Sequence, residues 1–318
     1  MNLLARSRLR QPEELAKQRV SLAGGRRKQR RSSHWSINLM YVPALILLSV
    51  FIFYPFFQGI HLSFTNWDGY SSQFRWVGLM QYGRILSDQV VLRTIVNTFI
   101  YGFGSTLLQN ILGLAYALFL DRKMRGKGVV RTIVYLPIMI SPLIMGYICY
   151  FFFQYDGGAA NDVLHVLGRA PVDWLSNGTA AVWIITFVNT YQYMGIAMLI
   201  YLAGLQAIPK EYLEAAAIDG ASALARFRRV TLPLLMPSIT ISVVYNIIGG
   251  LKLFDVIVAM TNGGPGDASQ SLSTMMYTLY FAREDAGYAA ALGIIMFLII
   301  TVVGLTMLRF LRRKEVQL

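Results

Sequence analysis

The sequence predicts an all-α, polytopic membrane protein. Of its 318 residues, 55% are hydrophobic and only 14% are charged, whereas average soluble proteins are roughly 25% charged. The mean hydropathy is +0.50, and five uncharged runs reach the length of about 20 mostly apolar residues that a helix needs to cross a bilayer. This composition excludes a disordered chain, a nucleic-acid-binding globule and, because Cys149 is the single cysteine, a disulfide scaffold.

Six membrane-spanning helices are expected, one for each apolar run. They lie at about residues 39–59, 94–120, 132–155, 180–203, 234–260 and 287–308. The first run is not a signal peptide, because it lacks a small-residue cleavage site and follows a basic stretch too long for an n-region. The fifth run qualifies in spite of two charges near its far end. Residues 39–310 therefore form one six-span domain between basic tails at residues 1–38 and 311–318.

The distribution of lysine and arginine orients these spans. With the N-terminus in the cytoplasm, the cytoplasmic segments hold 23 Lys and Arg residues and the external segments hold five. Cytoplasmic loops carry the excess of bases in membrane proteins, so both termini are predicted to be cytoplasmic. Ten of the bases belong to the tail at residues 1–38. Orientation next to anionic headgroups is the favoured explanation for this tail, and a dedicated lipid- or partner-binding role is the alternative.

Motifs for catalysis and for metal binding are absent. Residues 126–128 read Gly-Lys-Gly without the upstream glycine and the hydroxyl of a phosphate loop, so the chain should not hydrolyse ATP by itself. His34, His61 and His165 are scattered and form no H-E-x-x-H pair, which leaves a zinc site unsupported. We expect no enzyme, although a membrane-embedded enzyme or sensor is the alternative from another class.

The most informative segment is the predicted cytoplasmic loop at residues 209–233. Its alanine-rich first half favours a helix, and Gly220 stops that helix because glycine readily takes the left-handed conformation. A second short helix is expected from residue 222 to about 230, and Leu232-Pro233 should end it, since a residue before proline resists the helical region. The loop is therefore predicted to be a stiff helix–turn–helix that projects from the membrane.

The register of this loop resembles a known signature. The residues run Glu214-Ala215-Ala216, three residues, Gly220, nine residues, Val230, one residue and Leu232-Pro233. This order is similar to the E-A-A-x-x-x-G-x9-I-x-L-P loop of permease subunits in bacterial ABC importers, with valine in place of the usual isoleucine.

Two further motifs are similar to the carbohydrate branch of that family, of the maltose and glycerol-3-phosphate type. The first is Tyr54-Pro55 followed by Ser63-Phe64. The second is Phe254-Asp255 followed by Thr261-Asn262-Gly263-Gly264-Pro265-Gly266. The resemblance covers about residues 39–310 and leaves the N-terminal tail outside it.

The resemblance implies a subunit of the bacterial plasma (inner) membrane that imports a sugar or oligosaccharide. The implied partners are a second permease subunit in a heterodimer, two ABC ATPase subunits that bind ATP and Mg, and an extracytoplasmic solute-binding protein. No cofactor is implied for this chain itself. A same-fold permease for glycerol-3-phosphate or another polar solute is the alternative. The implied coupling helix, which would sit in a cleft of the ATPase, includes Glu214, Ala215, Ala216, Asp219 and Gly220.

Polar side chains within the spans mark either helix packing or a substrate pathway. Spans four and five combine amides with aromatic rings, a pairing that suits sugars. The predicted pathway residues are Asn189, Gln192, Tyr193, Asn246, Gly250, Lys252 and Phe254. The resemblance adds support for Asn189, Asn246 and Gly250, whose positions match sugar contacts of maltose-type permeases. The amides of span two, including Gln109, are favoured as contacts between helices.

Two features leave alternatives open. Lys252 and Asp255 lie three residues apart, which places them on one face of a continuous helix. A mutually neutralising pair is slightly favoured, and contact between Lys252 and an acidic or hydroxyl-rich solute is the alternative. Gly263, Gly264 and Pro265 form a predicted external turn, which either contacts the docked solute-binding protein or only connects two spans.

Overall fold

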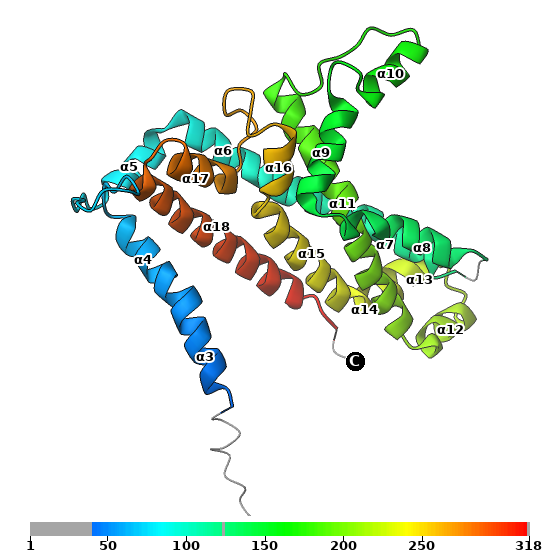
Figure 1. Ribbon diagram of the computed structural model, residues 1–318. Helices are drawn as coiled ribbons and strands as arrows, with labels where there is room; N and C mark the ends of the chain where they lie inside the picture. The colour runs from blue at the N-terminus through cyan, green and yellow to red at the C-terminus, as the bar shows by residue number, and fades with distance from the viewer. Residues whose placement is uncertain (1–39, 123–124, 317–318) are drawn as a thin grey trace, which may run out of the picture. The chain divides into compact units, whose positions relative to one another are not determined.

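The structure, a computed structural model, describes residues 40–122 and 125–316. Within these ranges the regular structure is helical, apart from an isolated antiparallel bridge between Thr65 and Trp76. The all-α prediction is therefore confirmed (Figure 1). The predicted tail at residues 1–38 lies outside the described residues. The chain divides into two units, residues 1–58 and 59–318, and each is described by itself.

The α-helices of the described residues, in chain order, are α3 (Val42–Leu48), α4 (Tyr54–Leu62), α5 (Met80–Ser87), α6 (Gln89–Phe99), α7 (Ser105–Leu120), α8 (Lys127–Tyr135), α9 (Pro142–Phe153), α10 (Ala159–Val166), α11 (Gly178–Ala207), α12 (Lys210–Ile218), α13 (Ala223–Arg226), α14 (Leu232–Leu234), α15 (Met236–Leu251), α16 (Asp255–Met260), α17 (Leu272–Phe281) and α18 (Ala286–Arg312). Short π-helical segments continue some of them, at η1 (Ser49–Phe53), η2 (Ile100–Gly104) and η4 (Phe227–Thr231), and a 3-10 turn, η3 (Leu136–Met139), follows α8.

Four helical segments are long and apolar enough to cross a bilayer, among the residues that the structure describes. They are Val42–Leu62, Gln89–Leu120, Gly178–Ala207 and Ala286–Arg312. Each overlaps a predicted span, at 39–59, 94–120, 180–203 and 287–308 respectively. In Val42–Leu62 no side chain is fully buried.

The third predicted span is sharply bent. Lys127–Met139 and Pro142–Phe153 meet at 99°, so the predicted span at residues 132–155 is not one continuous helix. Ile140 and Ser141 have extended backbone, with ψ of 134° and 137°. Pro142 disfavours the helical conformation for the residue before it and then begins the new helix at its first position. The bend therefore follows from Ser141-Pro142.

The fifth predicted span is interrupted twice. The helix of Ala223–Leu234 runs through Pro233 and bends by 66° before Met236–Leu251, so the prediction that Leu232-Pro233 ends the helix was wrong. The π-helical turn η4 precedes Pro233 and loosens the hydrogen-bond ladder that a proline would otherwise break. At the far end, α15 stops at Leu251 and α16 begins at Asp255. Residues 234–260 are thus not one continuous helix.

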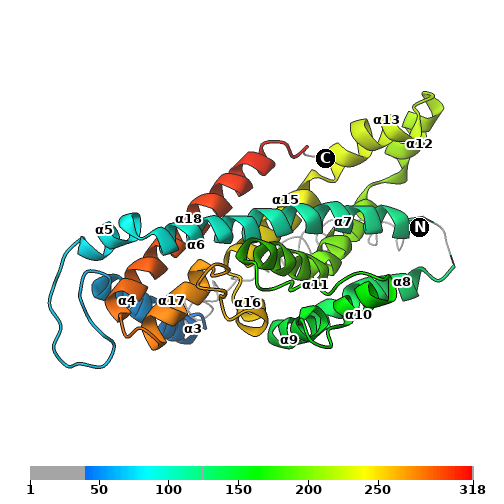
Figure 2. The same cartoon turned by 90° about the horizontal axis from the view of Figure 1, so that it is seen from above.

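The core of the second unit is the parallel pair of Gln89–Leu120 and α11 (Figures 1 and 2). Small residues set their spacing: a Cβ added at Gly113 would lie 2.6 Å from the Cβ of Ala197. At the same level, Gly195 of α11 lies against the backbone of Val134 and Tyr135. Glycine at a helix crossing lets backbones approach closely, and this packing gives α11 a fixed position beside α7 and α8.

The second unit has two distinct ends. Figure 1 shows α10 and the connection between α16 and α17 at one end, and α12 with the C-terminus of α18 toward the other. We refer to them as the α10 end and the α12 end. Helices α11 and α15 run between the two ends and lie side by side, as their contacts also show. The segment α12–α14 joins these two helices at the α12 end.

Candidate functional site

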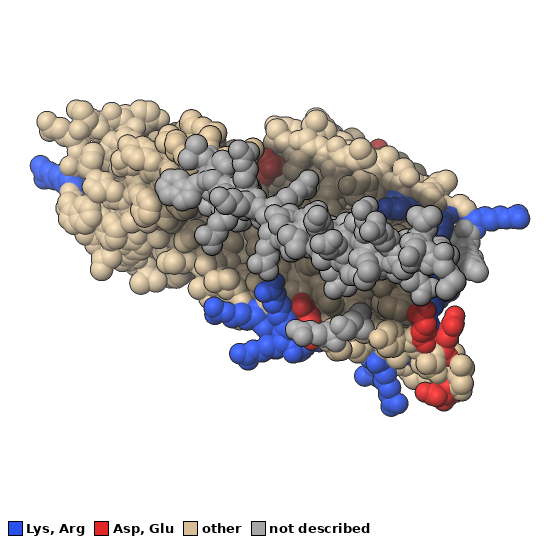
Figure 3. All heavy atoms as spheres, turned by 90° about the horizontal axis from the view of Figure 1, so that it is seen from below, with Lys and Arg blue, Asp and Glu red and all other residues tan. Residues whose placement is uncertain are grey.

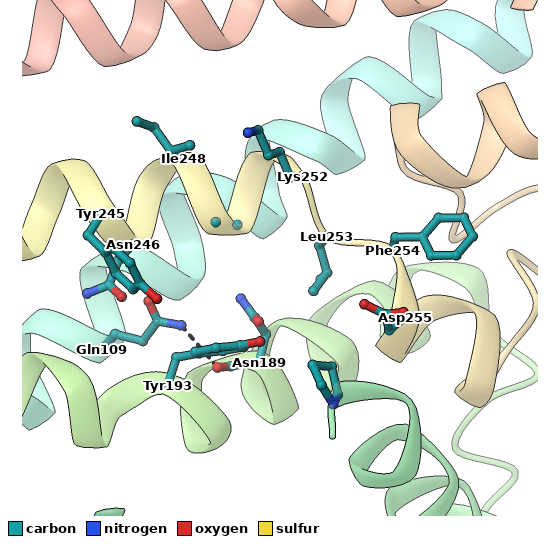
Figure 4. A pocket seen from close by; sticks show the side chains of 13 residues that line it. Gln109, Asn189, Tyr193, Tyr245, Asn246, Ile248, Lys252, Leu253, Phe254 and Asp255 are labelled. Atoms are coloured by element: carbon teal, nitrogen blue, oxygen red, sulfur yellow. Dashed lines mark hydrogen bonds between the residues drawn. The ribbon is translucent and has the colours of Figure 1, made fainter. Parts of the chain in front are cut away.

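A cavity of about 360 Å³ opens where α15 is interrupted. The residues that line it are Gln109, Pro142, Asn189, Tyr193, Tyr245, Asn246, Ile248, Gly249, Gly250, Lys252, Leu253, Phe254 and Asp255 (Figure 4). Six of the seven predicted pathway residues are in this set. Helix α11, helix α15 and the segment between α15 and α16 thus bring together residues that lie up to 65 positions apart in the sequence.

Amides and tyrosines of two helices face one another across the cavity. Asn189 and Tyr193 lie one turn apart on the same face of α11. Figure 4 shows them beside Gln109, opposite Tyr245 and Asn246 of α15. Each amide can donate and accept hydrogen bonds, and each phenol can do the same. The arrangement suits a solute that carries several hydroxyl groups.

Gln109 has two roles in this wall. Its Nε2 donates a 3.0 Å hydrogen bond to the main-chain carbonyl of Asn189, as expected for an amide between helices. Its Oε1 is buried and has no hydrogen-bond partner in the described part of the chain, and the residue also lines the cavity. Sequence reasoning did not assign Gln109 to the pathway. The sequence offered only the signal of a polar side chain within the second predicted span.

Lys252 and Asp255 do not form the expected pair. Both side chains are exposed, and among the described residues no ion pair joins them. Lys252 caps the C-terminus of α15, whereas Asp255 begins α16, and the intervening Phe254 has non-helical backbone angles of −135° and −65°. Because the helix is interrupted between them, the spacing of three residues no longer places them on one face. The favoured hypothesis of a neutralising pair was wrong.

Gln192 lies elsewhere. It is buried, and its Nε2 donates a 3.0 Å hydrogen bond to the carbonyl of Ile140, at the bend of the third predicted span. Gln192 directly precedes Tyr193, and adjacent residues of a helix point about 100° apart, so Gln192 lies toward Ile140 and does not line the cavity. Its amide therefore binds backbone that the bend has left without a helical partner, instead of joining the predicted pathway.

The two adjacent glycines of α15 have different surroundings. A Cβ added at Gly250 would lie 2.9 Å from the Cα of Gly102 and 2.9 Å from the carbonyl of Tyr101, whereas one added at Gly249 would meet nothing within 4 Å. Gly250 therefore allows α15 to pack on η2, although it also borders the cavity. Gly249 leaves the cavity open.

The predicted helix–turn–helix is present at the α12 end. Helix α12 has no buried residue, and Glu214, Ala215, Asp219 and Gly220 are exposed, while Ala216 is half-buried. Gly220 has the expected left-handed conformation, with φ of +75°, and the next N–H donates to the carbonyl of Ala216 at 3.0 Å. Figure 3 shows both acidic and basic side chains on this end.

The turn at Gly263–Gly266 is rigid, and only part of it is accessible. Gly263 is buried with φ of +83°, and an added Cβ would lie 2.3 Å from the side chain of Gln270. Of the three predicted contact residues, Pro265 is exposed and Gly264 is half-buried. Gly263 therefore shapes the turn and offers no accessible surface.

Hydrogen bonds fix the remainder of this connection to the second predicted span. The amide of Asn97 donates to the carbonyls of Ala268 (2.8 Å) and Gln270 (3.2 Å). The phenol of Tyr101 donates to the carbonyl of Ser269 at 2.8 Å. The segment between α16 and α17 is thereby held against α6 and η2.

Comparison with known proteins is consistent with this geometry. A family model described as binding-protein-dependent transport system inner membrane component matches residues 109–316. The trehalose/maltose transport system permease protein MalF of Thermococcus litoralis is 35% identical over 277 residues, which cover 86% of this chain and 94% of the relative. The multiple sugar-binding transport system permease protein MsmF of Streptococcus mutans is 33% identical over 285 residues, which cover 90% and 98%.

The fold is also that of a solved transporter. A chain in the crystal structure of a bacterial alginate ABC transporter, in complex with an alginate pentasaccharide-bound periplasmic protein, superposes with a TM-score of 0.76 and 25% sequence identity. The match covers 88% of this chain and 94% of that chain. Together with the family match over residues 109–316, these similarities show that the chain belongs to the family of binding-protein-dependent transport system inner membrane components.

Proposed function

We propose that this chain is the permease subunit of an ATP-driven ABC importer and forms half of a translocation pathway for a sugar or oligosaccharide. The observation that carries the proposal is the cavity at the interruption of α15, where Asn189 and Tyr193 face Tyr245 and Asn246. Amides and aromatic rings are the groups that orient hydroxyl-rich ligands. The relatives with trehalose/maltose and multiple-sugar names support the same class of solute.

The connection between the cavity and the α12 end supports a transport mechanism. Helix α11, which carries Asn189 and Tyr193, is followed by α12 after only Ile208 and Pro209. The segment α13–α14 leads into α15, the other wall of the cavity. A partner that moves α12 would therefore tilt α11 and α15, the two walls of the cavity. Rigid-body movement of helices is one way in which a protein switches between two states.

We assign that partner to an ABC ATPase. In this assignment two ATPase subunits bind ATP and Mg, and Glu214, Ala215, Ala216, Asp219 and Gly220 contact one of them. Four of these five residues are exposed and Ala216 is half-buried, which leaves this face available to another protein. The small side chains of Ala215 and Ala216 allow close approach. Closure of the ATPases would move the paired α12 helices and switch the cavity between inward-open and outward-open states.

The remaining partners follow from the same assignment. A second permease subunit would supply the other half of the pathway, and an extracytoplasmic solute-binding protein would deliver the solute at the α10 end, with Pro265 in the contact surface. In this orientation both termini face the cytoplasm and α12 lies on the cytoplasmic side of a bacterial plasma membrane. The alginate transporter, which was crystallised with its periplasmic protein, supports a delivery step of this kind.

One observation favours a second candidate solute. Lys252 lines the cavity and forms no ion pair with Asp255, in the part of the chain that the structure describes. An ammonium group in a cavity attracts phosphate or carboxylate. A glycerol-3-phosphate or another anionic polar solute is therefore the alternative to a neutral sugar.

Uptake by the reconstituted complex tests both candidates. The chain would be placed in vesicles with its second permease, ATPases and solute-binding protein, and uptake of labelled maltose, trehalose and glycerol-3-phosphate would be measured with and without ATP. ATP-dependent uptake of a sugar supports the proposal, and uptake of glycerol-3-phosphate alone supports the second candidate. Uptake of neither class, from a complex whose ATPases are active, would reject the two solute assignments.

A further inference from the structure

The residue before α17 hydrogen-bonds to the segment that follows α15, from outside the cavity lining. Ser271, the residue before α17, is 1% exposed, and its Oγ donates a 2.7 Å hydrogen bond to the carbonyl of Leu253. Leu253 lies between α15 and α16 and lines the cavity, whereas Ser271 does not. Any effect of Ser271 on a solute must therefore pass through the segment that Leu253 belongs to.

This hydrogen bond compensates for a break in the helical ladder. In the described structure, the N–H groups of Lys252 and Leu253 still bind Gly249 and Gly250, at 3.2 Å each. The Leu253 carbonyl accepts from a side chain instead of from the backbone of α16. A backbone carbonyl without a partner is costly at membrane depth, so the hydroxyl of Ser271 stabilises this particular arrangement of the interruption.

Ser271 itself has little freedom. Its N–H donates to Thr274 Oγ1 at 2.9 Å, and its Oγ accepts from the N–H of Thr274 at 3.2 Å, which forms a capping box. The next N–H, that of Leu272, donates to Thr98 Oγ1 on α6 at 2.9 Å. The donor of the Leu253 bond is thus fixed to α6 and to α17 and is not carried on a mobile side chain.

We propose that Ser271 is a positioning residue for transport: by binding the Leu253 carbonyl it sets the conformation of Lys252–Phe254, the segment that borders the cavity. The hydrogen bond between Tyr101 and Ser269 and the bond between Thr98 and Leu272 tie residues 269–272 to η2 and α6. The cavity wall and the Gly263–Gly266 turn are therefore parts of one hydrogen-bonded body. The transport arm of this inference rests on the proposed function.

The transport arm compares Ser271→Ala with Thr274→Val in the reconstituted complex. Both variants weaken the capping box, but only Ser271→Ala removes the bond to Leu253. We expect Ser271→Ala to keep assembly and stimulated ATPase activity while uptake per ATP falls about 5-fold, the factor typical of one lost hydrogen bond. Thr274→Val should stay close to the unmodified chain. Equal losses in the two variants would assign Ser271 to helix capping and overturn the inference.

A double variant separates positioning from general destabilisation. Because Ser271 acts in part through Phe254, combining Ser271→Ala with Phe254→Ala should lose less transport than the sum of the two single losses. Additive losses would show that the two residues act independently and would contradict the proposal.

A second arm needs no solute. Lys252→Cys is introduced into a chain whose single cysteine, Cys149, is replaced by serine, and its reaction with a water-soluble maleimide is followed in the assembled complex. Adding Ser271→Ala should change the labelling rate several-fold, and adding Thr274→Val should not. An unchanged rate with Ser271→Ala rejects the positioning role. This readout holds whichever solute is carried, so failure of the proposed function and failure of this inference are distinguishable.

Discussion

The side chain of Gln109 binds the main chain of Asn189, through a 3.0 Å hydrogen bond between Nε2 and the carbonyl oxygen. The position of α11 at this level is thus held by a residue of α7 and by the backbone of Asn189, without use of the Asn189 side chain. Asn246 donates within its own helix, to Ser242 Oγ at 3.3 Å. The two asparagine side chains therefore differ from Gln109, which joins two helices.

We expect Asn189→Leu and Asn246→Leu to assemble normally, to keep basal ATPase activity and to lose uptake. Loss of one hydrogen bond to a hydroxyl-rich solute should cost about 1–3 kcal/mol, roughly 5- to 150-fold in transport. Uptake into vesicles, normalised to assembled complex, measures this. Gln192→Leu is the matched control, because its amide binds Ile140 and its loss should reduce the amount of assembled complex instead. Normal uptake by both asparagine variants would remove them from the pathway.

Charge removal at the interruption of α15 should be additive. Lys252 and Asp255 share no ion pair in the described residues, so the double variant Lys252→Gln with Asp255→Asn should lose as much transport free energy as the two single variants together, within about 0.5 kcal/mol. Uptake rates of the four chains give this comparison. Rescue of either single variant by the second substitution would show that the two charges neutralise each other, contrary to the structure.

The helix crossing of α7 and α11 should not tolerate a methyl group. Gly113→Ala would place a Cβ 2.6 Å from the Cβ of Ala197 and 2.8 Å from the backbone nitrogen of Met198, which forces the helices apart. Gly249→Ala, also inside a helix, meets nothing within 4 Å and should gain from the higher helix propensity of alanine. Thermal stability in detergent should fall for the first variant and be kept or raised for the second. Equal melting temperatures would contradict the close crossing.

Substitution on the exposed face of α12 should uncouple the importer. Glu214→Lys and Ala215→Trp both change exposed side chains, so insertion and folding should be unaffected while ATP-driven uptake is abolished. Glu211→Lys makes the same charge change one turn earlier on this helix, outside the E-A-A register, and should transport better than Glu214→Lys. Copurification of the ATPase, together with uptake, measures the effect. Normal uptake by Glu214→Lys and Ala215→Trp would disprove the coupling assignment.

The isolated chain should not hydrolyse ATP. Its sequence has no phosphate loop, so phosphate release should be at background for the purified subunit and should rise only when the ATPase subunits are added. A matched preparation with an inactive ATPase controls for contaminating enzymes. Turnover by the chain alone, after that control, would refute the division of labour between subunits.

Hydropathy predicted which segments are helical but not where they break. The four predicted spans without an internal break match continuous helices, because a long apolar run has one stable conformation in a bilayer. The bend at Ser141-Pro142 was readable from the proline, yet the run of apolar residues concealed it. Pro233 shows the opposite error, because a π-helical turn let the helix continue. Local proline rules cannot anticipate such compensation by neighbouring residues.

The residues of the cavity were predicted from residue type and position in the spans. The errors in that prediction arise from local features of the helices. Residue type and span placed Asn189, Tyr193 and Asn246 correctly on the cavity wall. Gln192, one position before Tyr193 on α11, instead points toward Ile140. The interruption after Leu251 separated Lys252 from Asp255, and no periodicity in the sequence marks that interruption. The role of Gln109 depends on a contact between helices 80 residues apart, which a single sequence does not reveal.

The bare surface of α12 and α13 has a consequence for the life of the subunit. Tyr212, Leu224 and Ile218 are 47%, 67% and 87% exposed, and apolar groups left in water attract chaperones and proteases. A permease made in excess of its ATPase would keep this apolar surface exposed. Binding of the ATPase would cover it. On the proposed coupling assignment, chaperones and proteases would bind the same helix that contacts the ATPase, and the supply of ATPase would limit the number of permeases that persist.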